Sequence, residues 1–192
     1  MAKHMANGNK TEVSTARAVG EWIAVIGIAV AAALTIRAFV AEIYEVPSGS
    51  MLDTIQLGDR LIGEKLSYHF RTPQAGEVVT FIDPDDSSTT LIKRVIATAG
   101  QTVDLRDGVL YIDGVAQDEP YTEGKPSYPL TQHSARIAEI QYPYTVPDGC
   151  IWVMGDSRTN SLDSRYFGPV SVSSVTSHGL FIFWPVQDAH RL

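Results

Sequence analysis

The 192-residue sequence predicts a mainly β fold, an antiparallel sheet or barrel-like domain preceded by a single N-terminal transmembrane helix. Two features lead to this fold class. A run of fifteen residues without a charge occupies 22–36, and short runs rich in Val, Ile, Leu and aromatic residues follow residue 43, separated by turn residues. Because hydrophobic residues make up 44% of the chain and charged residues only 19%, we expect a packed core.

The first 18 residues are polar, with Lys3, Lys10 and Arg17 set against Glu12, and they predict a mobile tail. An excess of basic residues before a membrane span indicates that the N-terminus stays in the cytoplasm. The expected organisation is therefore a cytoplasmic tail at 1–18, a transmembrane anchor at 19–42 and an extracytoplasmic β-rich domain at 43–192. This arrangement corresponds to a single-pass protein of the cell membrane.

The apolar run at 22–36 is feasible as the centre of that anchor. As a helix it is about 22 Å long, which is less than the ~30 Å hydrocarbon core of a bilayer. Continuing through Arg37 to Ala41 makes twenty residues, and Arg37 can extend its charged end toward the interface. A cleaved signal peptide and a buried core helix remain alternatives for this run. The favoured interpretation is a membrane span, with the lipid bilayer as a partner.

After residue 43 the pattern is typical of short strands. Asp107-Gly108 and Asp113-Gly114 read as tight turns, and 84–88 as a loop between strands. Residues 116–147, rich in Pro, Tyr and polar groups, predict an irregular excursion over the surface. The predicted strands are 60–65, 77–83, 90–98, 102–106, 109–114, 150–156 and 179–185.

Composition excludes several kinds of function. A single cysteine, Cys150, rules out an intramolecular disulfide framework and a cysteine-cluster metal site. The five histidines form no H-x-x-x-H pair, so we expect neither a metal nor another cofactor. The net charge of −7 argues against nucleic acid as a partner.

Two segments carry candidate chemistry. In 47–51, PSGSM, Gly49 between two serines permits a tight turn that exposes a hydroxyl, although a polar linker is the alternative. In the strand around Lys93, alternation places this lysine on one face with Leu91 and Val95. Two explanations fit such a lysine. Its charge prevents an edge strand from pairing with other chains and aggregating. Alternatively, the lysine is desolvated, and its lowered pKa lets it act as a base.

A third segment, 155–168, is rich in Asp, Asn, Ser and Arg. This composition indicates a loop held by side-chain hydrogen bonds, which is either a purely structural turn or part of a functional site. Asp163 and Arg165 can pair within it. The chain has no G-x-S-x-G elbow and no histidine in a recognisable pattern beside Ser and Asp. A serine activated by a neutral lysine is another solution to the same chemical problem.

Taken together, four segments resemble the ordered motifs of bacterial type I signal peptidases. They are PSGSM (47–51), GDRL (58–61), IKRVIATAG (92–100) and GDSRTNSLDSRYFG (155–168), and they follow one apolar span, as in the short form found in Gram-positive bacteria. Three positions depart from the family pattern. Asp53 stands where the family usually has Pro, Ser157 where it has Asn, and Thr159 where it has Asp.

The resemblance implies a membrane-bound serine endopeptidase that removes signal peptides from secretory preproteins, cutting after small residues at P1 and P3. By the resemblance, Ser50 is the nucleophile and Lys93 the general base. The Ser48 hydroxyl and the Ser50 N–H would form an oxyanion hole. The two rival interpretations are a membrane-tethered β module without chemistry and a cytosolic, autoproteolytic repressor-type Ser–Lys protease.

The resemblance also assigns supporting residues. Ser161 would orient the Lys93 amine, and Asp163, Arg165 and Gly155 would hold the loop around it. The residues matching the substrate pockets for small side chains are Tyr44, Val46, Met51, Leu91 and Ile92.

Overall fold

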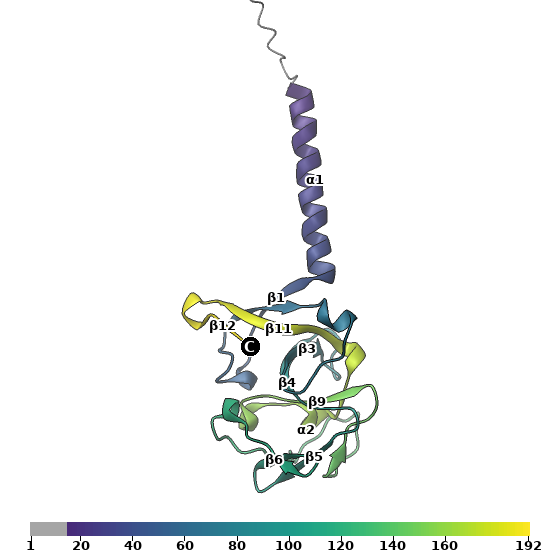
Figure 1. The fold of residues 1–192 in the computed structure, drawn as a ribbon, viewed down its shortest axis with the longest axis vertical. Coiled ribbons are helices and arrows are strands. Elements are labelled where there is room, and N and C mark those ends of the chain that lie inside the picture. The colour runs from purple at the N-terminus through teal and green to yellow at the C-terminus, as the bar shows by residue number, and fades with distance from the viewer. Residues whose placement is uncertain (1–14) are drawn as a thin grey trace, which may run out of the picture. The chain divides into compact units, whose positions relative to one another are not determined.

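The computed structural model describes residues 15–192, which divide after Ala38 into two compact units (Figure 1). The first unit is helix α1, Thr15–Phe39, whose large apolar side chains, such as Trp22 and Ile28, are exposed. From Arg17 to Phe39 this helix is long and apolar enough to cross a membrane. Of the tail expected at 1–18, residues 1–14 lie outside the described residues, whereas 15–18 already belong to α1. At the other end of the expected anchor, residues 41 and 42 belong to a strand.

The second unit is built on two antiparallel sheets, so the mainly β prediction is confirmed (Figure 1). The larger sheet has the order β1-β2-β11-β3-β4-β9-β10, with β12 added to β11, and the smaller has the order β7-β6-β5-β8. The larger sheet contains β1 (Ala41–Glu45), β2 (Arg60–Glu64), β3 (Val78–Ile82), β4 (Thr90–Thr98), β9 (Cys150–Met154), β10 (Val170–Ser171), β11 (Val175–Trp184) and β12 (His190–Arg191). The smaller contains β5 (Thr102–Arg106), β6 (Val109–Ile112), β7 (Val115–Ala116) and β8 (Tyr144–Thr145).

Each of the seven predicted strands forms, with β11 starting four residues earlier than expected, at Val175. The turns at Asp107-Gly108 and Asp113-Gly114 have positive φ at both residues, which is the geometry of a two-residue hairpin turn. Strand β1 was not predicted, because its first residues were assigned to the end of the apolar helix. The strands β7, β8, β10 and β12 are two residues long, too short for a periodic signal.

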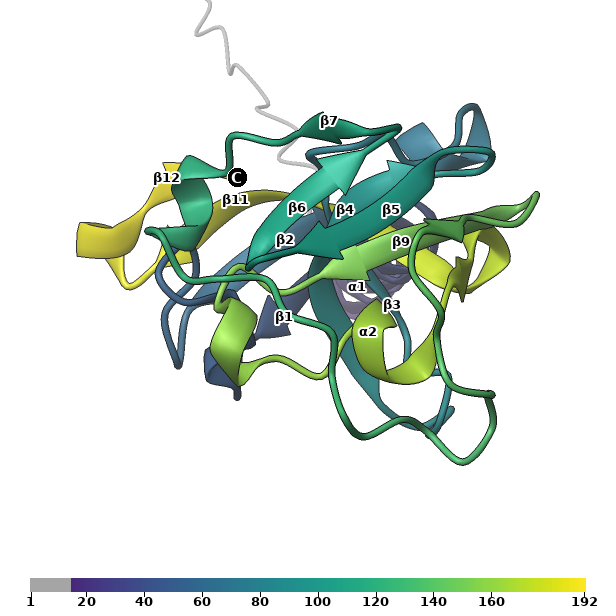
Figure 2. The same cartoon turned by 90° about the horizontal axis from the view of Figure 1, so that it is seen from below.

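Strand β9 separates two parts of the core. Ile151 and Val153 pack with the cluster that contains Phe81, whereas Trp152 and Met154 pack with the cluster of the smaller sheet. Burial on both faces explains why this segment is an uninterrupted apolar run. In Figure 2, β5 lies beside β9 with β6 on its other side, which agrees with the cluster that β5, β6 and β9 share.

A third cluster lies beneath the segment 47–51. Val46, just before the segment, and Met51, at its end, are 3% and 1% exposed. They pack in one cluster with Ile55 and with buried side chains of β2, β3 and β11, which are Leu61, Val78 and Ile182. The segment is therefore fixed to the core on both sides, with Pro47 and Ser48 exposed and Ser50 mostly buried.

The excursion at 116–147 corrects the sequence prediction. It is irregular, as expected, but it is not confined to the surface, because several of its side chains are buried. Ile140 and Val146 join the cluster around Trp152, and Ser134 donates a hydrogen bond to the Asp85 carboxylate. These contacts are long-range and follow no period, so the local sequence carried no signal of them.

Candidate active site

Ser50 lies in a short 3-10 turn, Gly49–Met51, and is 9% exposed. Its carbonyl oxygen accepts a hydrogen bond of 3.1 Å from the Ser157 N–H. Gly155 lies against the same carbonyl, and a Cβ at that position would overlap the Ser50 carbonyl oxygen and the Ser161 side chain. Only glycine therefore lets the loop at 155–168 approach the Ser50 turn so closely.

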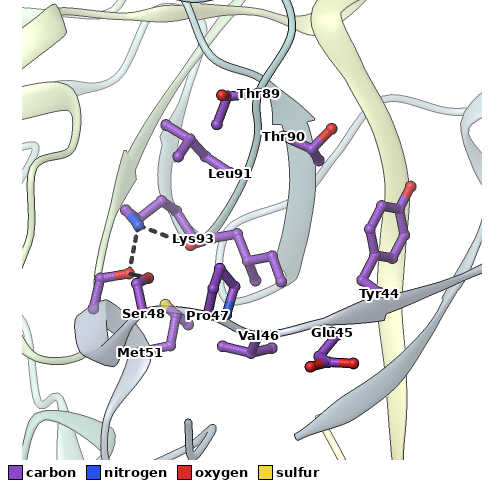
Figure 3. A pocket seen from close by; sticks show the side chains of 12 residues that line it. Tyr44, Glu45, Val46, Pro47, Ser48, Met51, Thr89, Thr90, Leu91 and Lys93 are labelled. Atoms are coloured by element: carbon purple, nitrogen blue, oxygen red, sulfur yellow. Dashed lines mark hydrogen bonds between the residues drawn. The ribbon is translucent and has the colours of Figure 1, made fainter. Parts of the chain in front are cut away.

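Lys93 comes from β4, and the dashed lines at its amine in Figure 3 mark its two hydrogen bonds. Its Nζ lies 2.6 Å from Ser50 Oγ and 3.0 Å from the carbonyl oxygen of Ile92. The side chain is almost fully buried, with Lys93 only 3% exposed. The distance is short enough for direct proton transfer between the hydroxyl and the amine.

Burial lowers the pKa of Lys93 from its ordinary 10.5 to about 8, because the ammonium form loses its hydration. Three carboxylates, those of Asp163, Asp83 and Asp156, act in the opposite direction. Asp163 forms an ion pair with Arg165, and Asp156 forms one with Arg94. Because these two carboxylates are engaged by guanidinium groups, burial remains the larger effect, and Lys93 loses its proton at a pH of about 8.

The Asp163–Arg165 pair organises the loop at 155–168. Arg165 Nε and Nη2 each lie 2.9 Å from an oxygen of the Asp163 carboxylate, and both residues are at most 1% exposed. The same carboxylate accepts the Gly155 N–H at 3.0 Å and the Arg165 N–H at the start of α2 (Ser164–Phe167). The pair thus fixes Gly155, and through it the backbone beside Ser50.

The structure lacks the hydrogen bond between Ser161 and the Lys93 amine that the resemblance implied. Ser161 is 8% exposed, and its hydroxyl has no hydrogen-bond partner among residues 15–192. The second partner of Lys93 is instead the carbonyl oxygen of Ile92. In the described geometry, Ser161 contributes packing against Gly155 and no bond to the lysine.

Ser48 lies at the outer side of the turn, and its Oγ is 3.5 Å from Ser50 Oγ. The N–H groups that open a helical turn have no acceptor within that turn. The Ser50 N–H belongs to this class, since it lies at the start of the 3-10 turn. Two potential donors, the Ser48 hydroxyl and the Ser50 N–H, are therefore present next to the Ser50 hydroxyl.

A cavity of about 270 Å³ opens beside the Ser50–Lys93 pair (Figure 3). The side chains of Val46 and Met51 lie on one side of it, and those of Leu91 and Lys93 lie on the other. Its lining comprises the five residues assigned to the pockets, Tyr44, Val46, Met51, Leu91 and Ile92, together with Ser48, Ser50, Lys93, Glu45, Pro47, Thr89 and Thr90. Four lining residues were not predicted for the pockets: Glu45, Pro47, Thr89 and Thr90, although Thr90 begins a predicted strand.

Two strand edges along this cavity have no partner strand within the described part of the chain. β1 pairs only with β2, and the pairing of β4 with β9 begins at Arg94, which leaves the preceding residues of β4 paired with β3 alone. Unpaired edges present backbone donors and acceptors at regular spacing. The cavity can therefore accept an extended peptide as an added strand.

Among residues 15–192, no group of His, Cys, Asp and Glu is arranged to hold a metal ion.

Comparison with known proteins gives a consistent result. Residues 19–184 match the model of the family described as "Signal peptidase, peptidase S26". The chain is 40% identical over 176 residues to a probable signal peptidase I-1 of Synechocystis, covering 88% of this chain and 84% of that one. It is 37% identical to a signal peptidase I of Leptolyngbya laminosa, covering 90% and 83%. It is 35% identical to a signal peptidase I of Bacillus licheniformis, covering 89% and 91%.

Proposed function

Because the chain belongs to the signal peptidase family, peptidase S26, we propose that it removes signal peptides from exported preproteins by means of a Ser50–Lys93 dyad. The observation that carries the proposal is the 2.6 Å contact between Lys93 Nζ and Ser50 Oγ at the edge of a cavity with two unpaired strand edges. The chain is accordingly a hydrolase of the signal peptidase I type.

In the proposed reaction, neutral Lys93 takes the proton of Ser50 as Oγ attacks the carbonyl carbon of the P1 residue. The resulting ammonium then gives a proton to the leaving amine, which departs as the new N-terminus of the mature protein. Lys93 next takes a proton from the water that attacks the acyl-enzyme ester. Expulsion of Ser50 Oγ, which regains its proton, releases the signal peptide with a free carboxylate.

The oxyanion formed at the P1 carbonyl needs donors that are already in place. We assign this role to the Ser50 N–H and the Ser48 hydroxyl, which lies 3.5 Å from Ser50 Oγ. The arrangement supports the assignment because both groups lie on the same turn as the nucleophile, so the attack and the stabilisation share one rigid element.

We propose that the cavity selects small side chains on the substrate. An extended peptide alternates its side chains, so P1 and P3 point into the cavity while P2 points away. We expect the side chains of Val46, Met51, Leu91 and Ile92, which line this cavity, to leave room only for small side chains at P1 and P3. We expect replacement of P1 Ala by Leu to lower kcat/KM at least about 100-fold, because the larger side chain overlaps the wall.

The measurement is kcat/KM on a matched series of peptides that differ only at P1, P2 or P3. The same Ala-to-Leu change at P2 serves as the control and should cost far less. Equal rates for Ala and Leu at P1 would contradict the assignment of the pocket.

The function itself is tested by incubating the full-length protein with a preprotein in detergent and sequencing the N-terminus of the product. A single cut after an Ala-x-Ala motif supports signal peptide removal. The rival interpretation, a tethered β module that binds without chemistry, requires the preprotein to remain intact.

Membrane attachment is the second part of the proposal. Helix α1 is long and apolar enough to span a bilayer, and Lys3, Lys10 and Arg17 precede its apolar centre. We therefore place the N-terminus in the cytoplasm and residues 43–192 on the extracytoplasmic side. This orientation puts the catalytic domain where exported preproteins emerge.

Single cysteines test this orientation in intact cells. With Cys150 replaced by serine, we expect Gln132→Cys, in the exposed part of the excursion, to react with a membrane-impermeant maleimide. Lys10→Cys should react only after the cells are opened. The proposed orientation would be contradicted if Lys10→Cys reacted in intact cells while Gln132→Cys reacted only after the cells were opened.

A further inference from the structure

The segment 119–127, which we call the strut, joins three parts of the active site from outside both sheets. Its base is held by a buried ion pair between Glu119 and Arg158, with contacts of 2.5 and 2.6 Å, and Arg158 is 1% exposed. Arg158 also donates to the hydroxyl of Ser127 at the far end of the strut. Both ends of the strut are thus fixed to one buried guanidinium in the loop 155–168.

The middle of the strut contacts the strand that carries Lys93. The guanidinium carbon of Arg94 lies 4.1 Å from the centroid of the Tyr121 ring, a cation–π contact. The Tyr121 hydroxyl donates a hydrogen bond of 2.8 Å to the Glu119 carboxylate. Arg94 is adjacent to Lys93 and forms two hydrogen bonds with the Asp156 carboxylate. These contacts leave the strut little freedom to move relative to β4.

The tip of the strut reaches the turn that carries the nucleophile. Lys125 Nζ lies 2.8 Å from an Asp53 carboxylate oxygen, and Asp53 is three residues after Ser50. The Lys125 N–H donates a hydrogen bond to the Thr122 carbonyl. Gly124, just before it, has a φ of 74°, which glycine adopts without strain. The hydrogen bond from Lys125 lowers the pKa of Asp53, so the pair is fully charged at neutral pH.

We infer that Lys125 is a positioning residue, which acts through Asp53 to fix the turn that presents Ser50 to the substrate. The inference rests on the proposed function and concerns how this chain holds its nucleophile. The inner side of the turn is fixed by buried Met51 and by the Ser157 N–H on the Ser50 carbonyl. Asp53 is on the outer side, and its carboxylate is held by the strut. Since attack requires Oγ within a few tenths of an ångström of its productive place, loosening this side lowers kcat.

The first test is Lys125→Met, with kcat and KM measured on a preprotein or a signal-peptide substrate. We expect kcat to fall about 3- to 5-fold with KM unchanged, the size that an exposed ion pair supports. Lys125→Arg should keep at least half of the activity, since it preserves the charge. Arg136→Met removes a charge from an exposed site in the same excursion and should leave kcat unchanged. The melting temperature should be the same within a few degrees, because the ion pair is exposed.

The second test exchanges the charges. Asp53→Lys and Lys125→Asp should each lower kcat. The double variant restores the ion pair with the two charges exchanged, and its kcat should be within about twofold of the wild-type value. At about 1 M salt the difference between wild type and Lys125→Met should shrink, because the pair is then screened.

Wild-type kcat in Lys125→Met, or a double variant no better than the poorer single variant, would overturn the positioning role while leaving the proposed function intact. Failure of the wild type itself to cut a preprotein would overturn both.

Discussion

We expect Ser50→Ala to abolish cleavage of a preprotein, with kcat/KM falling about 10,000-fold or more, because no other group would take the place of the proposed nucleophile. The change removes one hydroxyl from a turn whose position depends on buried Met51 and on the hydrogen bond from Ser157 to the Ser50 carbonyl. The fold therefore stays intact. The measurement is product formation from a preprotein in detergent, with circular dichroism and thermal unfolding to show that the variant is folded.

Ser50→Cys is the matched variant, since it keeps a nucleophile of similar size at the same place. A thiol is competent, so slow turnover should remain above the level of the alanine variant. Normal cleavage by Ser50→Ala would remove the basis of the mechanism.

We expect Lys93→Arg to be inactive although it preserves the positive charge, because a guanidinium stays protonated throughout the range in which the enzyme would work. The loss should be of the order of 1,000-fold or more, since both proton transfers in the proposed cycle depend on this amine. Lys93→His keeps a usable base on a shorter side chain and should retain a trace of activity. The measurement is kcat/KM for both variants on the peptide used for the wild type.

The arginine variant needs a folding control, because Lys93 is 3% exposed and arginine is larger. Lys93→Met, which is similar in size and cannot ionise, provides it. If Lys93→Met is folded and inactive, the loss belongs to the missing base. Activity in either variant close to that of the wild type would show that another group takes the proton of Ser50.

The sheet was predictable because most of its strands carry strong local signals. The apolar run around Trp152 is continuous because β9 is buried on both faces, and the hairpin at Asp107-Gly108 has the turn residues that its positive φ values require. Lys93 was recognisable as unusual because strand alternation put a charge between Leu91 and Val95. The strand, the turn and the unusual lysine could each be predicted because each depends on residues that are close together in the sequence.

The features that sequence reasoning missed depend on contacts between distant residues. Glu119 and Arg158 are 39 positions apart, and nothing in either local sequence indicates that they pair. Because the sequence did not indicate this ion pair, it predicted the excursion at 116–147 as a surface loop. For Ser161 the resemblance implied a bond to Lys93, whereas its hydroxyl has no partner within the described residues. Side-chain orientation in a closely packed loop depends on neighbours such as Gly155, which motif matching does not describe.

The pH dependence of kcat/KM for the wild type tests the central claim, that a buried, neutral Lys93 activates Ser50. The pKa of Lys93 is lowered by burial to about 8, so the base is neutral above that pH and protonated below it. Activity should therefore rise with pH, about tenfold per pH unit on the acidic side, and level off above pH of about 8. A profile that is flat from about pH 5 to 9 would contradict the claim, because no group with the pKa of Lys93 would then control the reaction.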